Sequence, residues 1–206
     1  MIAIIDYEAG NLTSVERALV HLGVPCRVTA DAGEIRAADR VVFPGVGAAA
    51  AAMGVLRARG LDAVIRDVIG QKKPFLGICL GAQIMLDHSE EDGGTECLGI
   101  IPGNVRRFAH EGKGFKIPHM GWNDIRVRRS HPILEGIGDE DRFYFVHSYY
   151  LETTDAHDCV AMTDYGVPFV SVMGRGAVFA VQFHPEKSGP QGLRILKNFA
   201  AWKGEA

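Results

Sequence analysis

Apolar and polar positions repeat with two different periods in the first half of the chain, which predicts strands separated by helices. Residues 2–6 are apolar from the start and indicate a buried strand, whereas residues 11–21 place Leu12, Val15 and Leu19 on one side of a helix. Further strands are predicted at residues 25–29, 41–43 and 75–78, and helices at residues 48–59, 61–69 and 81–88. This alternation predicts a doubly wound α/β fold, with a mostly parallel sheet and helices on both faces.

The second half consists of shorter apolar pieces separated by Gly, Pro and Asp. Strands are predicted at residues 104–108, 114–117, 124–127, 143–146, 159–163, 169–172 and 178–181, and a closing helix at residues 191–202. His119, Met120 and Trp122 fall in a predicted loop bounded by Pro and Gly. We expect these strands to form an antiparallel extension of the sheet, within one domain over residues 1–206.

The composition is that of an ordinary globular protein, and it excludes several classes. Hydrophobic residues make up 47% of the 206 positions, and the net charge of −3 argues against a nucleic-acid partner. No apolar run reaches the ~20 residues of a membrane span, and the N-terminus lacks the basic segment of a secretory signal. Because the four cysteines form no C-x-x-C pair, we expect a cytoplasmic protein without a zinc ribbon or a disulfide framework.

The segment Gly77-Ile78-Cys79-Leu80-Gly81, at the end of a predicted strand, has the pattern of a nucleophile elbow. Glycines on both sides allow a sharp strand-to-helix turn that lifts the Cys79 side chain clear of the sheet. The start of the following helix would favour the thiolate through its positive dipole end. The alternative is a buried structural cysteine in a Gly-rich loop, because cysteine is among the most buried residue types.

A second candidate element, His184-Pro185-Glu186, follows the predicted strand at residues 178–181. Pro185 cannot continue a central strand, so His184 and Glu186 are expected at its end. Residues two apart in an extended chain point the same way, which would let the carboxylate orient the imidazole as a general base. The alternative is a surface turn with a solvated glutamate. In company with Cys79, the catalytic interpretation is favoured.

Two further features bear on the chemistry. The loop Pro44-Gly45-Val46-Gly47 follows a strand and precedes an Ala-rich helix, so its N–H groups, with that of Leu80, can form an oxyanion hole. The alternative is a plain strand-to-helix connection. We expect no metal site, because the histidines lack the spacing of a helix-borne site.

These motifs resemble those of the class I (triad) glutamine amidotransferases, namely Gly77-Ile78-Cys79-Leu80-Gly81 with Gln83, and Gln182-Phe183-His184-Pro185-Glu186. Other segments, in order along nearly the whole chain, resemble the glutaminase subunits of imidazole glycerol phosphate synthases: Asp6-Tyr7, Gly10-Asn11-Leu12, Pro44-Gly45-Val46-Gly47, Ile117-Pro118-His119-Met120-Gly121-Trp122-Asn123 and Phe145-Val146-His147-Ser148-Tyr149. The segment from Pro118 to Asn123 is the most discriminating. The resemblance implies a flavodoxin-like fold and no cofactor.

The resemblance also implies roles for individual residues. Cys79 would attack the side-chain amide of glutamine, His184 would transfer protons, and Glu186 would orient His184. The other implied roles are oxyanion stabilisation by Val46, Gly47 and Leu80, substrate binding by Gly45, Gln83 and His147, and partner contact by Asn11, Met120, Trp122, Tyr144 and Lys187. The implied partner is a (β/α)8-barrel cyclase, which uses the ammonia to form imidazole glycerol phosphate and an aminoimidazole carboxamide ribotide.

Several alternatives remain at this point. Lys187 is equally compatible with a solvated lysine, and the aromatic strand around Tyr144 and His147 with ordinary sheet packing. Glu8, Ala9 and Ala82 depart from the residues common in relatives and bear on partner contacts or pocket packing. The rival functions are the glutaminase of another synthase, and a non-catalytic subunit that only supports a synthase.

Overall fold

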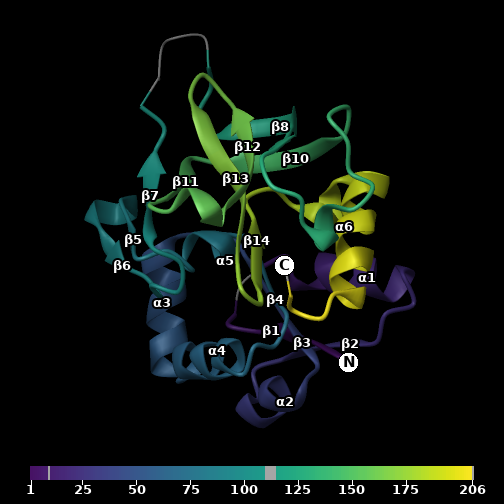
Figure 1. Ribbon diagram of the computed structural model, residues 1–206. Helices are drawn as coiled ribbons and strands as arrows, with labels where there is room; N and C mark the ends of the chain where they lie inside the picture. Colours follow the sequence, from purple (N-terminus) through teal and green to yellow (C-terminus); the bar gives the residue numbers. More distant parts are fainter. Residues whose placement is uncertain (9, 110–114, 206) are drawn as a thin grey trace.

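The computed structural model describes residues 1–8, 10–109 and 115–205 (Figure 1). Within these residues, the strands form a 12-stranded mixed sheet and a separate 2-stranded sheet. Ala9 and residue 114 lie outside the described residues. Residues 115–117 belong to no strand, so the prediction of a strand at residues 114–117 is wrong for the part that the structure describes.

The parallel half of the large sheet carries the elbow. Its strands lie in the order β2-β1-β3-β4-β14, each parallel to its neighbour. Their bounds are β1 Ile2–Ile5, β2 Cys26–Thr29, β3 Arg40–Gly45, β4 Phe75–Cys79 and β14 Val178–Val181. This arrangement confirms the predicted doubly wound fold. It also places β14, from the end of the chain, between β4 and the antiparallel strands.

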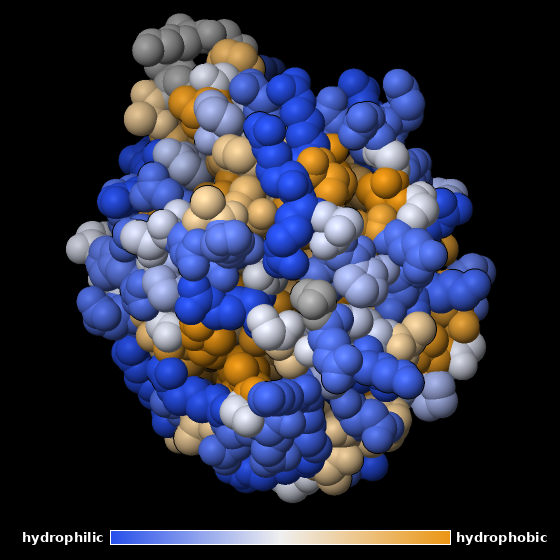
Figure 2. All heavy atoms as spheres, viewed as in Figure 1, coloured by the Kyte–Doolittle hydropathy of each residue, from blue (hydrophilic) through white to orange (hydrophobic). Residues whose placement is uncertain are grey.

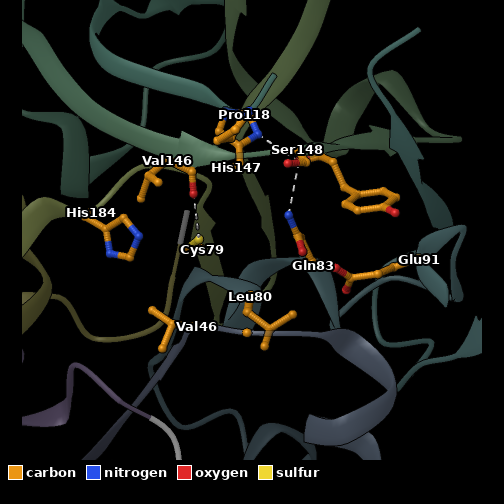
Figure 3. Close-up of a pocket in the computed structure, with 12 residues that line it drawn as sticks. Val46, Cys79, Leu80, Gln83, Glu91, Pro118, Val146, His147, Ser148 and His184 are labelled. Carbon is orange, nitrogen blue, oxygen red and sulfur yellow. Dashed lines mark hydrogen bonds between the residues drawn. The ribbon is translucent and has the colours of Figure 1, made fainter. Parts of the chain in front are cut away.

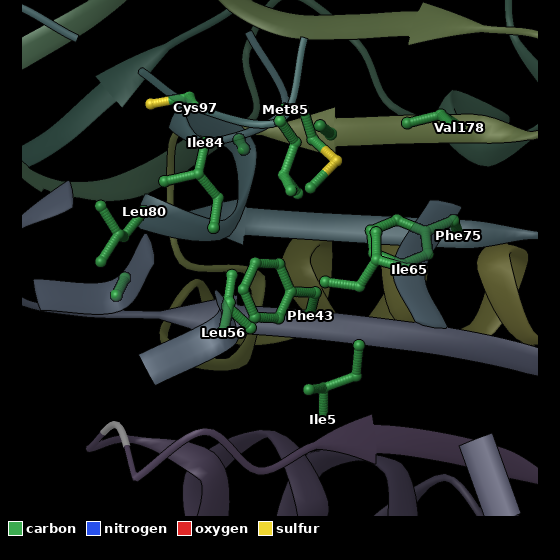
Figure 4. Close-up of a cluster of buried hydrophobic side chains, with 14 of the residues drawn as sticks. Ile5, Phe43, Leu56, Ile65, Phe75, Leu80, Ile84, Met85, Cys97 and Val178 are labelled. Atoms are coloured by element: carbon green, nitrogen blue, oxygen red, sulfur yellow. The ribbon is translucent and has the colours of Figure 1, made fainter. Parts of the chain in front are cut away.

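Helices cover both faces of this parallel half because successive strand residues point to opposite sides. Phe43 and Phe75 pack with Leu56 and Ile65 under α3 and α4 (Figure 4), whereas Val42 belongs to a second core under α1 and α6. The helices are α1 Leu12–His21, α2 Ala32–Ala37, α3 Ala49–Ala58, α4 Leu61–Gly70, α5 Leu80–Gln83 and α6 Gly189–Ala201.

The second half of the chain extends the sheet mainly by antiparallel pairing, as predicted. Strand β13 pairs antiparallel with β14, β11 and β12, and β11 pairs antiparallel with β7. The bounds are β5 His88–Ser89, β6 Thr95–Glu96, β7 Gly103–Arg107, β9 Arg126–Val127, β11 Tyr149–Thr153, β12 Cys159–Asp164 and β13 Pro168–Arg175. Single turns of 3-10 helix occur at η1 Glu91–Gly93, η2 Pro132–Leu134, η3 Ala156–Asp158 and η4 Pro185–Lys187.

The 2-stranded sheet pairs β8, His119–Asp124, with β10, Arg142–His147. The prediction of a loop around residues 119–122 is therefore wrong, and so is a strand at residues 124–127, which is divided between β8 and β9. The aromatic stretch also breaks at Ser148, where the chain passes from β10 to β11 in the other sheet.

The predicted helix over residues 81–88 is wrong, because α5 ends at Gln83. The next three carbonyl groups, those of Ile84, Met85 and Leu86, accept hydrogen bonds from the backbone of residues 98–101. They are therefore engaged by another segment and cannot continue the helix.

The face of the molecule in Figure 2 is largely hydrophilic, and hydrophobic side chains are visible only in separate patches. Among the described residues, no helix combines the length and apolar character that a membrane crossing requires.

Candidate active site

Cys79 occupies a sharp turn between β4 and α5. It is the last residue of β4 and has φ 54° and ψ −109°, while Leu80 begins the helix at once. Positive φ at a residue with a side chain costs on the order of 1–3 kcal/mol and persists only where the surroundings impose it. The predicted nucleophile elbow is present in the backbone.

The glycines beside Cys79 are required by close packing. A Cβ atom at Gly81 would lie 1.9 Å from the Phe43 carbonyl oxygen, and one at Gly77 would lie 2.8 Å from the Gly81 carbonyl oxygen. Gly45, at the end of β3, has a similar role, because a Cβ atom there would lie 2.9 Å from the Gly81 nitrogen. The turn at Cys79 therefore packs directly against β3.

His184 and Glu186 form a buried pair beside the elbow. His184 Nδ1 and Glu186 Oε1 are 2.7 Å apart, and the two side chains are 1% and 0% exposed. Pro185 begins the 3-10 turn η4, so this turn and not an extended strand brings the two side chains together. The sequence analysis predicted that His184 and Glu186 lie together, but it attributed their contact to an extended chain and not to a 3-10 turn.

The carboxylate of Glu186 fixes the orientation of the imidazole ring. Because it accepts the Nδ1 proton, the second nitrogen, Nε2, is left toward the pocket, where Figure 3 shows the ring facing Cys79. Burial acts to lower the pKa of His184, but interactions with Cys79 and Glu186 outweigh it and raise that pKa to about 10. The sulfur and the carboxylate on either side of the ring therefore favour its protonated form.

Asn11 completes this arrangement from the other end of the chain. Its amide nitrogen donates to the same Oε1 atom of Glu186, at 2.5 Å. Asn11 has φ 74° and stands at the N-terminus of α1, just beyond β1. The sequence assigned Asn11 only to a partner interface; its contact with Glu186 was missed.

A cavity of about 330 Å³ opens over the sulfur (Figure 3). Most of the site residues that the sequence indicated line it: Val46, Gly47, Cys79, Leu80, Gln83, His147 and His184. Gly45 does not line this cavity; it lies beneath the elbow and contacts the Tyr7 hydroxyl region. The other lining residues are Glu91, Pro118, Val146, Ser148 and Tyr149.

Glu91 is a site residue that the sequence did not reveal. Its Oε2 atom accepts the N–H of Ala49 at 2.7 Å, at the start of α3, where no side chain of the helix itself provides a cap. Burial is the main cause that raises the pKa of Glu91. A carboxylate is thereby held at the positive end of α3 and at the wall of the cavity.

Gln83 presents one end of its amide to the cavity. Its nitrogen donates to the carbonyl oxygen of Tyr149 at 3.1 Å and to Oε1 of Gln182 at 3.2 Å. Both protons are thus engaged within the protein, and the Gln83 carbonyl oxygen is available to accept from a ligand.

His147 is part of the cavity wall, and its side chain is buried. Its Nδ1 lies 2.7 Å from the Tyr149 carbonyl oxygen, and its Nε2 lies 2.9 Å from Nδ1 of His119 on the facing strand. Burial lowers the pKa of His147 to about 3 and that of His119 to about 4.

The predicted partner-contact residues lie outside the cavity and are more exposed. Met120 and Trp122 on β8 are 61% and 51% exposed. Trp122 pairs across the strands with Tyr144, and Met120 pairs with Val146, which lines the cavity. An apolar exposed face therefore adjoins the site. Lys187, the last residue of η4, is also exposed.

No group of three or more His, Cys, Asp or Glu side chains suited to hold a metal ion occurs in the described part of the chain. The polar groups around Cys79 instead comprise a thiol, an imidazole paired with a carboxylate, and a cavity with a second carboxylate. This set suits acyl transfer through a thiol.

Comparison with known proteins agrees with this chemistry. The sequence profile of the family Glutamine amidotransferase class-I matches residues 3–202, and the chain belongs to this family. It is 50% identical over 208 residues to imidazole glycerol phosphate synthase subunit HisH of Pseudomonas putida, with 98% of each chain covered. It is also 50% identical over 211 residues to HisH of Nitratidesulfovibrio vulgaris, covering 100% of this chain and 99% of that one. Within the amidotransferases, it groups with the HisH subunits.

Solved structures support the fold independently. A glutamine amidotransferase superposes with a TM-score of 0.76 at 18% identity, covering 98% of this chain and 100% of that chain. PurLQS from Thermotoga maritima superposes with a TM-score of 0.74 at 17% identity, and 97% of each chain is covered.

Proposed function

We propose that this protein is the glutaminase subunit of an imidazole glycerol phosphate synthase, with Cys79, His184 and Glu186 as its catalytic triad. The observation that carries the proposal is the buried His184–Glu186 pair facing a cysteine on a strained elbow, in a chain about half identical to HisH subunits. The substrate is L-glutamine, and the products are glutamate and ammonia.

The first half of the reaction forms a γ-glutamyl thioester. The Cys79 sulfur attacks the side-chain amide carbon, and the N–H of Leu80 with the loop at Val46 and Gly47 stabilises the oxyanion. His184 Nε2 gives its proton to the departing nitrogen, so the C–N bond breaks and ammonia leaves. In the second half, water attacks the thioester carbon with His184 as base, and the C–S bond breaks to release glutamate.

The cavity offers groups that match the α-carbon end of glutamine. The Glu91 carboxylate provides a negative charge for the α-ammonium group, and the Gln83 carbonyl oxygen provides an acceptor. Glutamine oriented in this way would extend its side chain toward Cys79. We assign Glu91 and Gln83 to substrate binding, with His147 supporting the wall.

The partner is a cyclase subunit with a (β/α)8 barrel, to which ammonia passes without release into water. The exposed apolar face of β8 and β10 supports this assignment, because it adjoins the cavity through Val146. We assign partner contacts to Asn11, Met120, Trp122, Tyr144 and Lys187. The complex works in the cytoplasm and needs no cofactor.

The Cys79→Ala variant tests the proposal in the complex with the cyclase. We expect synthesis from glutamine to fall by at least about three orders of magnitude, because the nucleophile is absent. Synthesis from added ammonium salts is expected to continue at the wild-type rate. Product formation from each nitrogen source is followed separately.

The matched control is Cys26→Ala, since Cys26 lies away from the cavity on β2. Loss of the ammonium-driven reaction in Cys79→Ala would show that Cys79 has a structural role. Retention of the glutamine-driven reaction would exclude it as the nucleophile.

A further inference from the structure

Gln182 contacts the nucleophile although it belongs to neither the triad nor the cavity wall. It follows β14 directly, is 0% exposed, and its amide nitrogen lies 3.8 Å from the Cys79 sulfur. A buried amide so close to the reacting atom can act on it if its N–H, and not its oxygen, faces the sulfur.

The neighbouring hydrogen bonds determine which end of Gln182 faces the sulfur. The Tyr149 carbonyl oxygen can only accept, so the Gln83 atom 3.1 Å from it is the amide nitrogen. That nitrogen also donates to Gln182 at 3.2 Å, which must therefore present its oxygen. The NH2 group of Gln182 is left pointing at Cys79.

The Tyr149 carbonyl that sets this orientation is itself held in place from the opposite side. It accepts the Nδ1 proton of His147, whose Nε2 then accepts from Nδ1 of His119. His119 in turn lies 3.3 Å from the amide nitrogen of Asn123, which also donates to the Asp164 carbonyl oxygen. Two backbone carbonyl groups thus fix every donor and acceptor along this chain of hydrogen bonds.

We propose that Gln182 is a further catalytic residue, which donates an N–H hydrogen bond to the Cys79 sulfur. The bond stabilises the thiolate before it attacks and again when the C–S bond of the thioester breaks and the sulfur takes the electron pair. A hydrogen bond to the charged form of a group favours that form. The inference rests on the proposed function for the reaction, but the contact with the sulfur does not depend on it.

The test measures the reactivity of the thiol in the purified full-length protein. Gln182→Met has nearly the same length and no donor. The midpoint of the pH–rate profile for reaction of its Cys79 with iodoacetamide is expected to rise by about one pH unit, as the loss of one hydrogen bond to a charged group predicts. Gln182→Glu keeps the acceptor for Gln83 but places a carboxylate at the sulfur, so the midpoint is expected to rise further. The modified cysteine is identified by peptide mass.

Glutaminase assays in the cyclase complex should show the same order in kcat, with KM for glutamine little changed. Gln71→Met, at the exposed end of α4, is the matched control and should react at the wild-type rate. A Gln182→Met protein with wild-type thermal unfolding and wild-type alkylation would overturn the proposal. If that variant does not fold, wild-type alkylation of Gln182→Glu would overturn it equally.

Failure of the proposed function would look different. A wild-type protein that alkylates at Cys79 in a Gln182-dependent manner, yet releases no ammonia from glutamine, would contradict the glutaminase assignment and leave the sulfur contact intact.

Discussion

Glu91 serves two structures with one carboxylate. One of its oxygens caps the first turn of α3, immediately after the loop at Val46 and Gly47, and the side chain also lines the cavity. In the proposed function, an ammonium group that binds this carboxylate would act on the same segment that we assign to oxyanion stabilisation. Substrate recognition and the position of this loop would then depend on one residue.

The variant Glu91→Gln tests the recognition role. Its amide oxygen can still accept from Ala49, so α3 stays capped, but the charge that pairs with the α-ammonium group is lost. We expect KM for glutamine to rise about 10–100-fold, as loss of a hydrogen bond to a charged group predicts, with a smaller effect on kcat. Steady-state glutaminase kinetics in the cyclase complex measure both constants.

Glu90→Gln is the control, because Glu90 bonds to Arg106 and Arg107 and does not line the cavity. An unchanged KM in Glu91→Gln would limit Glu91 to helix capping.

At the scale of single residues, the sequence revealed those groups that neighbouring residues in the chain identify. Cys79 was found because its two glycines stand beside it. Asn11, Glu91 and Gln182 bond to partners 175, 42 and 103 residues away, and nothing in the neighbouring sequence reveals these contacts. Only the folded chain brings such pairs together.

The pair of strands β8 and β10 buries two neutral histidines against each other. His119 and His147 stand opposite in the register, and each also contacts the ring of Phe108. Burial lowers the pKa of both, to about 4 and about 3, which is below the ~6.5 of an exposed histidine. The packing of this strand pair therefore favours the uncharged form of both histidines.

Acid should destabilise the fold through this pair. Between pH ~6.5 and the lowered pKa values, the unfolded chain binds more protons than the folded chain, so the free energy of unfolding falls as pH falls. Above pH ~6.5 both histidines are neutral in both states and add no pH dependence. We expect His119→Gln to weaken the dependence by up to about 1.4 kcal/mol per pH unit, measured by urea unfolding from pH 7 to pH 5.

Gln71→Met, at the exposed end of α4, changes no titratable group, so it is the control and should keep the wild-type slope. Equal slopes for the wild type and His119→Gln would show that His119 does not gain a proton on unfolding in this range.

Helices and strands with a clear hydrophobic period were predictable from the sequence. Those whose ends or pairing depend on contacts with other segments were not. Residues 2–5, 26–29 and 75–79 are strands close to their predicted bounds. Strand β8 was missed because Pro118 and Gly121 suggest a loop, whereas pairing with β10 makes it a strand. Helix α5 was overextended because the later carbonyl groups bond elsewhere.

The whole molecule places an exposed apolar face next to the mouth of its active site. Met120 and Trp122 are more than half exposed, while Val146 across the strands lines the cavity. Trp122 contacts Tyr144 with ring centroids 6.1 Å apart. Large aromatic residues exposed on a free subunit are common anchors of protein interfaces.

Trp122→Ala should weaken binding of the cyclase. A central tryptophan at an interface is commonly worth about 2–4 kcal/mol, so we expect Kd to rise at least about 30-fold. Calorimetric titration of the cyclase subunit measures it, and thermal unfolding of the free variant should be nearly unchanged because Trp122 is half exposed.

Val20→Ala removes a side chain that is 63% exposed on α1 and is the control. Wild-type affinity in Trp122→Ala would place the cyclase on another face.

The sequence predicted the layered α/β plan but not the order of its strands. Local periodicity cannot show that β14, from the end of the chain, joins β4 and β13. Pairing of distant strands is decided by the packing of the whole core.

The late position of β14 has a consequence for the cell. The ribosome makes Cys79 long before His184, and β14, which lies between the two halves of the sheet, is the last strand to be made. A half-made or prematurely terminated polypeptide therefore has a thiol without its imidazole. We therefore expect a polypeptide that ends before residue 184 to lack the proposed glutaminase activity.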